Sequence, residues 1–318
     1  MRKLSLAMVA VAALVFSEPV LAQERSEPIV VESGALRFIV DAPEGMERFA
    51  EMAAEVVEDN WPLVATAAGV GNVVPERGGE ITVSVEREID DWFVRRDVPP
   101  RNPEWAAGLA IYSESAVIIR SANPEWESTL AHELAHMAVD VASGGRRVPR
   151  WFNEGFAVAT AEQWSIERAT TMISAGLSGN FYDFDELTNG FPAAASSAGL
   201  AYAQSFHFVQ YITKNYGDGV FVGVMRRLRE DGAEWNVAFE AEAGIPLAAA
   251  EALWVSHVST RYKWAPAIGG GGGAWGAIAA LSLVAWRRKK RSAVERLAAL
   301  GASEAQLFSP DPDDKTFG

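Results

Sequence analysis

The hydrophobic and polar positions divide the sequence into a strand-rich part followed by a mainly helical part. Short hydrophobic stretches bounded by polar residues predict strands at 35–40, 80–85, 106–114 and 116–121. Hydrophobic residues at helical spacing predict a helix over 46–68, which we expect Pro62 to distort or divide. The pattern is mostly helical from Asn123 onward, so we expect an α+β fold in which a mixed sheet with helices precedes a mainly helical part.

The two ends of the chain have the patterns of export and membrane insertion. Basic residues precede an apolar run that ends in small residues near Ala22, which predicts a signal peptide at 1–22. An uncleaved anchor is the alternative. Residues 265–286 carry no charge and, as a helix, would extend ~33 Å against a hydrocarbon core of ~30 Å. The basic run at 287–291 is typical of a stop-transfer signal, so we expect one transmembrane helix there. The alternative is a Gly-rich linker followed by a soluble amphipathic helix.

This organisation predicts an exported domain at 23–262 and a cytoplasmic segment at 287–318, made of the basic cluster and a partly disordered tail. The formal net charge of −14 argues against nucleic acid as a partner, because phosphate binding needs clustered Lys and Arg. The chain contains no cysteine. Any transition metal must therefore be held by His, Asp or Glu.

The segment "NPEWESTLAHELAHMAVDVASGG" has the start and stop signals of one helix. Asn123 can cap it, Pro124 suits its first turn, and Gly144 can end it. One apolar stripe along this helix is suited to packing; it consists of Leu130, Leu134, Met137 and Val141.

Two histidines occupy a different face of that helix, one turn apart. The rings of His132 and His136 can therefore converge on one point, and Glu133 is rotated only about 60° from His136. This is the H-E-x-x-H arrangement, in which two imidazoles hold zinc and the glutamate acts as the general base. The alternative is a polar helix face with two solvated histidines.

A zinc site of this kind needs a third protein ligand. Val139 and Ala142 stand where a metzincin would have Gly and His, so that class is excluded. Glu154 is a better candidate because it lies early in a second predicted helix that begins after Pro149. A short loop between the two helices would let them pack antiparallel and bring Glu154 beside the histidines.

The segments "HELAH" and "PRWFNEGFA" together resemble the gluzincin zinc metallopeptidases, and most closely the bacterial peptidase-MA-like domains. The family segment W-x-x-E-G-x-A maps onto Trp151, Glu154, Gly155 and Ala157. The resemblance implies a zincin-like fold over most of the exported part, with one Zn²⁺ per chain.

The resemblance also implies roles for single residues. His132, His136 and Glu154 would bind the zinc, and Glu133 would take a proton from water and pass it to the leaving amine. Gluzincins often stabilise the oxyanion with a Tyr or His from a later helix; we choose Tyr202 for this role and hold His207 in reserve.

Two further expectations come from the same family. The strand at 116–121 would form the sheet edge along which an extended peptide lies, with an ordinary core strand as the alternative. Val158 stands where thermolysin-like enzymes have an aspartate that orients a histidine, and Asp140 is a candidate replacement or a solvated carboxylate.

The sequence therefore predicts a membrane-anchored zinc metallopeptidase that hydrolyses peptide bonds. We expect a single-pass protein of a bacterial cell membrane, with its catalytic domain periplasmic or extracellular and its C-terminus cytoplasmic. Its partners would be a peptide or protein substrate and the membrane. Two alternatives stay open: a zinc hydrolase acting on a non-peptide or cell-wall amide, and a catalytically silent domain for peptide binding or envelope assembly.

Overall fold

The computed structural model describes residues 25–75, 78–99, 106–161, 166–192, 195–262 and Ser282. The chain consists of two units, Met1–Ser256 and His257–Gly318, and the fold described below belongs to the first, apart from the end of the last helix at 257–262. The signal peptide expected at 1–22 and the tail expected at 287–318 lie outside the described residues, as does 265–286 apart from Ser282. Within the described part of the chain, no helix combines the length and apolar character that crossing a membrane requires.

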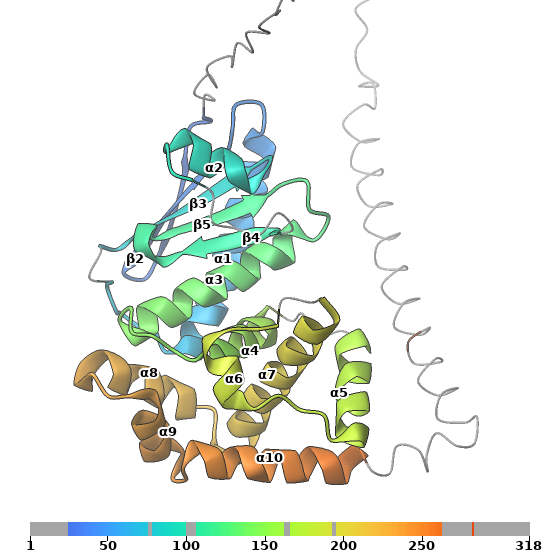
Figure 1. Cartoon of the computed structure of the whole chain (residues 1–318). Coiled ribbons are helices and arrows are strands. Elements are labelled where there is room, and N and C mark those ends of the chain that lie inside the picture. The colour runs from blue at the N-terminus through green and yellow to red at the C-terminus, as the bar shows by residue number, and fades with distance from the viewer. Residues whose placement is uncertain are drawn as a thin grey trace, which may run out of the picture. The chain divides into compact units, whose positions relative to one another are not determined.

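A five-stranded mixed sheet forms the first half of the fold (Figure 1). In chain order the strands are β1 (Ile29–Ser33), β2 (Leu36–Asp41), β3 (Glu80–Glu86), β4 (Gly108–Ile111) and β5 (Ala116–Arg120). They lie in the order β1-β2-β3-β5-β4. The three inner strands are parallel, and β1 and β4 run antiparallel to their neighbours. The sequence pattern did not reveal β1.

The strand order corrects the expectation that 116–121 forms the sheet edge. β5 lies between β3 and β4, and the edge strand beside it is the four-residue β4. Residues Ala116 to Ile119 are all buried, because helices cover the sheet on both faces. A continuous hydrophobic run of this kind is typical of an inner strand rather than of an edge.

Two long helices pack against the sheet on one side, and a short one lies on the other (Figure 1). These are α1 (Glu47–Ala68) and α3 (Trp126–Ser143), with α2 (Ile89–Arg95) opposite them. The expected division of α1 is wrong, because the helix continues through Pro62. Pro62 lies on the exposed side of α1, where water can satisfy the backbone carbonyl that the missing N–H would have served.

Seven helices follow α3 in the described chain, which confirms the predicted α+β class with its mixed sheet first. They are α4 (Arg150–Thr160), α5 (Ile166–Ser178), α6 (Phe184–Asn189), α7 (Ala195–Tyr216), α8 (Val220–Asp231), α9 (Trp235–Ala243) and α10 (Leu247–Tyr262). Helix α3 ends at Gly144, as predicted, and its expected apolar stripe is buried. Its cap is Glu125 rather than Asn123; Asn123 accepts a hydrogen bond from the Glu125 backbone N–H instead.

Helix α4 is held between α3 and α7. An aromatic core fixes it, in which Trp151 is fully buried against Phe184 and Phe208. Gly155 allows the close approach of α7, because a Cβ atom at this position would lie 2.6 Å from the carbonyl oxygen of Ser205. The segment "RWFNEG" therefore turns its glutamate toward α3, with its aromatic residues and its glycine directed into the core.

Candidate metal centre

The two histidines of α3 meet the glutamate of α4. The Nε2 atoms of His132 and His136 each lie 3.6 Å from Oε2 of Glu154. The two imidazole rings are nearly perpendicular, with their centroids 4.6 Å apart. Ligand atoms from all three side chains lie within 4.8 Å of one another. The short α3–α4 connection thus brings together the three residues that the sequence pattern singled out.

This arrangement fits a single zinc ion. A tetrahedral ion with bonds of about 2.0–2.1 Å holds its ligand atoms roughly 3.4 Å apart, close to the spacing of these nitrogen and oxygen atoms. Two imidazoles and one carboxylate are a donor set that Zn²⁺ takes readily, and three protein ligands leave a fourth position for water or substrate. The three side chains are mostly buried, with 9–13% of their surface exposed.

Glu133 is buried beside the edge strand. A Cβ atom on Gly108 of β4 would lie 2.7 Å from Cγ2 of Thr129 and 3.0 Å from Cγ of Glu133, so glycine lets the strand approach α3 this closely. Burial raises the pKa of Glu133 to about 7, and the charge of Glu154 adds to the rise. His136 and a hydrogen bond from the Ala110 backbone oppose it. A carboxyl group poised near neutrality can both take and return a proton.

The two oxygens of Glu154 have different partners. Oε2 faces the histidines, and Oε1 lies 3.3 Å from Nε of Arg150 on the same helix. Burial alone would raise the pKa of Glu154, but a hydrogen bond to His132 and the positive charges around the carboxylate lower it to about 2. The carboxylate is therefore ionised and available as a metal ligand.

Tyr202 lies near this centre, and His207 is engaged elsewhere. Burial and the charge of Glu154 raise the pKa of Tyr202 to about 12, so its hydroxyl stays protonated and can donate. A hydrogen bond with Arg150 opposes the rise. Nδ1 of His207 accepts a hydrogen bond of 2.9 Å from the indole N–H of Trp254. This contact gives His207 a packing role, which favours Tyr202 as the candidate donor.

The residue that contacts the outer nitrogen of His136 was not anticipated. Nδ1 of His136 lies 3.0 Å from Oδ1 of Asn153, and Nδ2 of Asn153 donates to the Tyr112 hydroxyl at 3.0 Å. We expected Asp140 as a candidate for this support, but Asn153 occupies the position at Nδ1. The only available signal was the position of Asn153 directly before Glu154 in the motif.

His132 differs from His136 in this respect. Its Nδ1 atom is buried and has no hydrogen-bond partner among the described residues. Val158, which replaces the orienting aspartate of thermolysin-like enzymes in the motif, is fully buried. The motif lacks the orienting aspartate, and in the structure Nδ1 of His132 correspondingly has no hydrogen-bond partner among the described residues.

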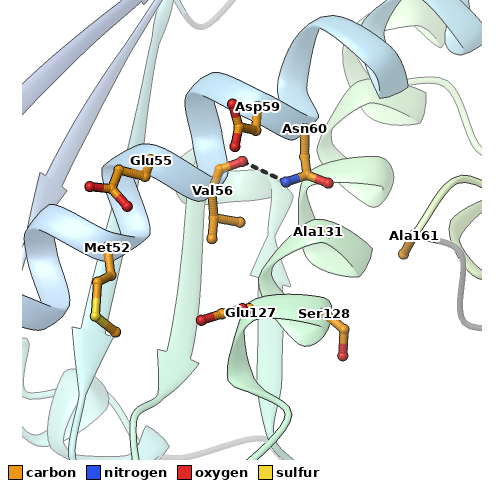
Figure 2. A pocket seen from close by; sticks show the side chains of 9 residues that line it. All are labelled: Met52, Glu55, Val56, Asp59, Asn60, Glu127, Ser128, Ala131 and Ala161. Carbon is orange, nitrogen blue, oxygen red and sulfur yellow. Dashed lines mark hydrogen bonds between the residues drawn. The ribbon is translucent and has the colours of Figure 1, made fainter. Parts of the chain in front are cut away.

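A separate hollow of about 380 Å³ lies beside α3 (Figure 2). It is lined by residues of α1 and of the first turns of α3, together with Ala161. Its polar groups include Glu55, Asp59 and Glu127, and Asn60 donates to the Val56 carbonyl at its wall. None of the three clustered ligands lines this hollow, so it is distinct from the metal centre.

Comparisons with known proteins identify the family to which the chain belongs. Residues 100–260, about half of the chain, match the model of the Peptidase MA superfamily. No curated protein matches the chain. Among solved structures it is similar to an M1 zinc metallopeptidase from Deinococcus radiodurans, at 16% identity and a TM-score of 0.33, over 76% of this chain and 51% of that one.

A variant of the Deinococcus enzyme, solved with a bound Tyr-Ser-Ala substrate, is similar at 15% identity and a TM-score of 0.39, over 73% of this chain and 51% of that one. The chain thus spans about half the length of the M1 structures it matches. On the match over residues 100–260, the chain belongs to the Peptidase MA superfamily and carries a gluzincin-like peptidase domain.

Proposed function

We propose that the chain is a zinc-dependent metallopeptidase. The observation that carries this proposal is the convergence of Nε2 of His132, Nε2 of His136 and Oε2 of Glu154, with the buried Glu133 adjacent on α3. A domain that only bound peptides would have no need of a buried carboxyl group at this position, because burying it costs stability.

A hydrolytic site of this kind has three working parts: the metal, a general base and a donor to the oxyanion. Zinc held by these residues would polarise the scissile carbonyl and lower the pKa of a coordinated water. Glu133 takes the proton of the attacking water and passes it to the leaving amine, as its raised pKa suits. Tyr202, protonated at neutral pH, donates to the developing oxyanion.

We assign substrate binding to β4 in place of the strand first expected. β4 is the edge of the described sheet next to α3, and its Gly108 and Ala110 lie against Glu133. An extended peptide that paired with this edge would place its backbone beside the general base. A strand edge at this position supports an extended peptide as the substrate rather than a compact small molecule.

We also retain the proposal that the chain is exported and held in a bacterial cell membrane by residues 265–286, with residues 287–318 in the cytoplasm. The uncharged stretch and the basic run after it support this topology. A reporter fused after Arg291 should be active only in the cytoplasm. A reporter active on the outer side would exclude this orientation.

The decisive experiment compares the purified full-length chain with Glu133→Gln. We expect one zinc per chain in both proteins, and hydrolysis of an unstructured peptide that falls roughly 100- to 10,000-fold in the variant. Zinc binding without hydrolysis of peptides would favour the alternatives, a non-peptide amide substrate or a silent binding domain. A wild-type chain that binds no zinc would refute the proposal.

A further inference from the structure

Two hydrogen bonds connect a proposed zinc ligand to the turn after the edge strand. The first joins His136 Nδ1 to Asn153 Oδ1, and the second runs from Asn153 Nδ2 to the hydroxyl of Tyr112, each at 3.0 Å. Tyr112 begins the short 3-10 helix Tyr112–Glu114 that joins β4 to β5. This 3-10 helix, α3 and α4 therefore meet behind His136.

The Asn153 amide can serve His136 in only one of its two orientations. If Nε2 is to bind a metal, Nδ1 carries the proton and needs an acceptor, which Oδ1 provides. Rotating the amide by about 180° would turn two N–H donors toward that N–H, and the contact would become repulsive. The Asn153 backbone alone does not choose between these orientations.

Tyr112 holds the amide in the orientation that serves His136. Its hydroxyl is buried and meets Nδ2 of Asn153, where it acts as the acceptor. Burial raises the pKa of Tyr112 above its ordinary range, and the charges of Glu133, Glu154 and Asp140 act in the same direction. The hydroxyl therefore stays neutral and remains in place as the partner of the amide.

We propose that Tyr112 is a positioning residue of the metal centre, which holds the Asn153 amide against Nδ1 of His136 and through it fixes the ring of this ligand. The inference rests on the proposed zinc site. Of the two histidines, only His136 has a hydrogen-bond partner at Nδ1 among the described residues. Tyr112 thereby links the edge strand, where peptide would bind, to the metal ligand.

The test is zinc affinity of the full-length chain, measured by competition with a chromogenic chelator. Tyr112→Phe keeps the ring and should weaken zinc binding about ten-fold, at the low end for loss of an outer-shell partner. Tyr211→Phe, the same chemical change on α7, should leave the affinity unchanged. A Tyr112→Phe chain with wild-type affinity would overturn the inference.

A second background separates positioning from packing. In Asn153→Ala the amide through which Tyr112 would act is absent, so the further loss of the Tyr112 hydroxyl should change zinc affinity less than two-fold. An equal loss in both backgrounds would mean that Tyr112 only packs, and would overturn the inference. Because the readout is metal affinity, a chain that binds zinc but hydrolyses no peptide would refute the proposed function alone.

Discussion

Two buried clusters of carboxylates, one in the sheet and one between the helices, are compensated in different ways. In the sheet, Glu86 is fully buried and accepts hydrogen bonds from Arg25 at 3.0 Å and Arg95 at 2.7 Å. Arg25 also pairs with Asp41. At the metal centre, Glu154 faces two imidazole nitrogens and a single, half-exposed arginine, and Glu133 has no arginine partner among the described contacts.

The difference distinguishes a structural ion-pair network from a site for a cation. A guanidinium carries a fixed charge and five donors, so it satisfies a buried carboxylate completely and leaves no lone pair for a ligand. An imidazole can present a lone pair instead, so a carboxylate that faces two such rings can bind a metal ion together with them. The four predictions below test this contrast.

The sheet network should show the largest effect on folding. Glu86→Gln leaves the guanidinium groups of Arg25 and Arg95 without their shared carboxylate, and we expect a loss of about 3–5 kcal/mol in the free energy of unfolding. Urea denaturation of the zinc-free chain measures this loss. Zinc affinity of the folded variant should not change. A loss of zinc binding without a loss of stability would contradict the structural role of Glu86.

The helical cluster should respond in the opposite way. Glu154→Gln alters one of the three proposed ligands, and we expect zinc affinity to fall roughly 100- to 1,000-fold, on the basis of about 3–4 kcal/mol for each ligand of a four-coordinate site. Chelator competition measures the change, with Glu86→Gln as the matched control. Unchanged affinity in Glu154→Gln would show that the third ligand lies elsewhere.

The sequence was sufficient to predict the residues of the helical cluster. The helix period alone places His132, Glu133 and His136 at neighbouring positions on one surface. Gly144 ends this helix and Pro149 precedes the next, so the two helices can pack antiparallel. This helix arrangement is nearly sufficient to bring Glu154 into contact with the two histidines. Four strands of the mixed sheet could also be predicted, since they are separate hydrophobic stretches, whereas β1 was missed.

What the sequence did not reveal depends on pairing between distant elements. The Asn153–Tyr112 hydrogen bond joins positions 41 residues apart, and no local pattern signals it. The edge assignment failed for a similar reason, because strand order is set by the packing of whole elements. The buried run Ala116–Ile119 was nevertheless a usable sign of an inner strand.

The pH dependence of the zinc-free chain should reveal the uncompensated carboxyl group. The pKa of Glu133 is raised from 4.5 to about 7, so the folded chain binds this proton more tightly than the unfolded chain. The contribution of Glu133 to the free energy of unfolding is therefore greatest below pH 4.5 and declines as the pH rises toward 7. Above pH 7 the free energy of unfolding is lower by about 3 kcal/mol than it would be with a protonated Glu133. Glu133→Gln should abolish this decline.

Glu154 should affect the pH dependence of stability in the opposite direction. Its folded pKa of about 2 lies below the ordinary 4.5, so its contribution is present above pH 4.5 and is lost as the pH falls toward 2. Denaturation of zinc-free chains between pH 3 and pH 8 should find Glu133→Gln more stable than wild type at pH 8, and Glu154→Gln less stable. The same sign for both variants would contradict the assigned environments.

The smallest effect should come from the single arginine of the metal centre. Arg150 is 46% exposed, and its contact with Glu154 resembles a surface ion pair, supplemented by the ring of Phe191 at 5.2 Å. Arg150→Gln should therefore cost less than about 1 kcal/mol of stability and weaken zinc binding by no more than about five-fold.

The matched control is Arg226→Gln, because Arg226 is 56% exposed and lies 3.6 Å from Glu242 in a similar ion pair far along the chain. It should change stability as little and leave zinc affinity unaltered. A 100-fold loss of zinc affinity in Arg150→Gln would mean that a guanidinium, and not the imidazole pair alone, sustains the ionised Glu154. The proposed difference between Glu86, which is paired with arginines, and Glu154, which is left to bind a metal, would then be wrong.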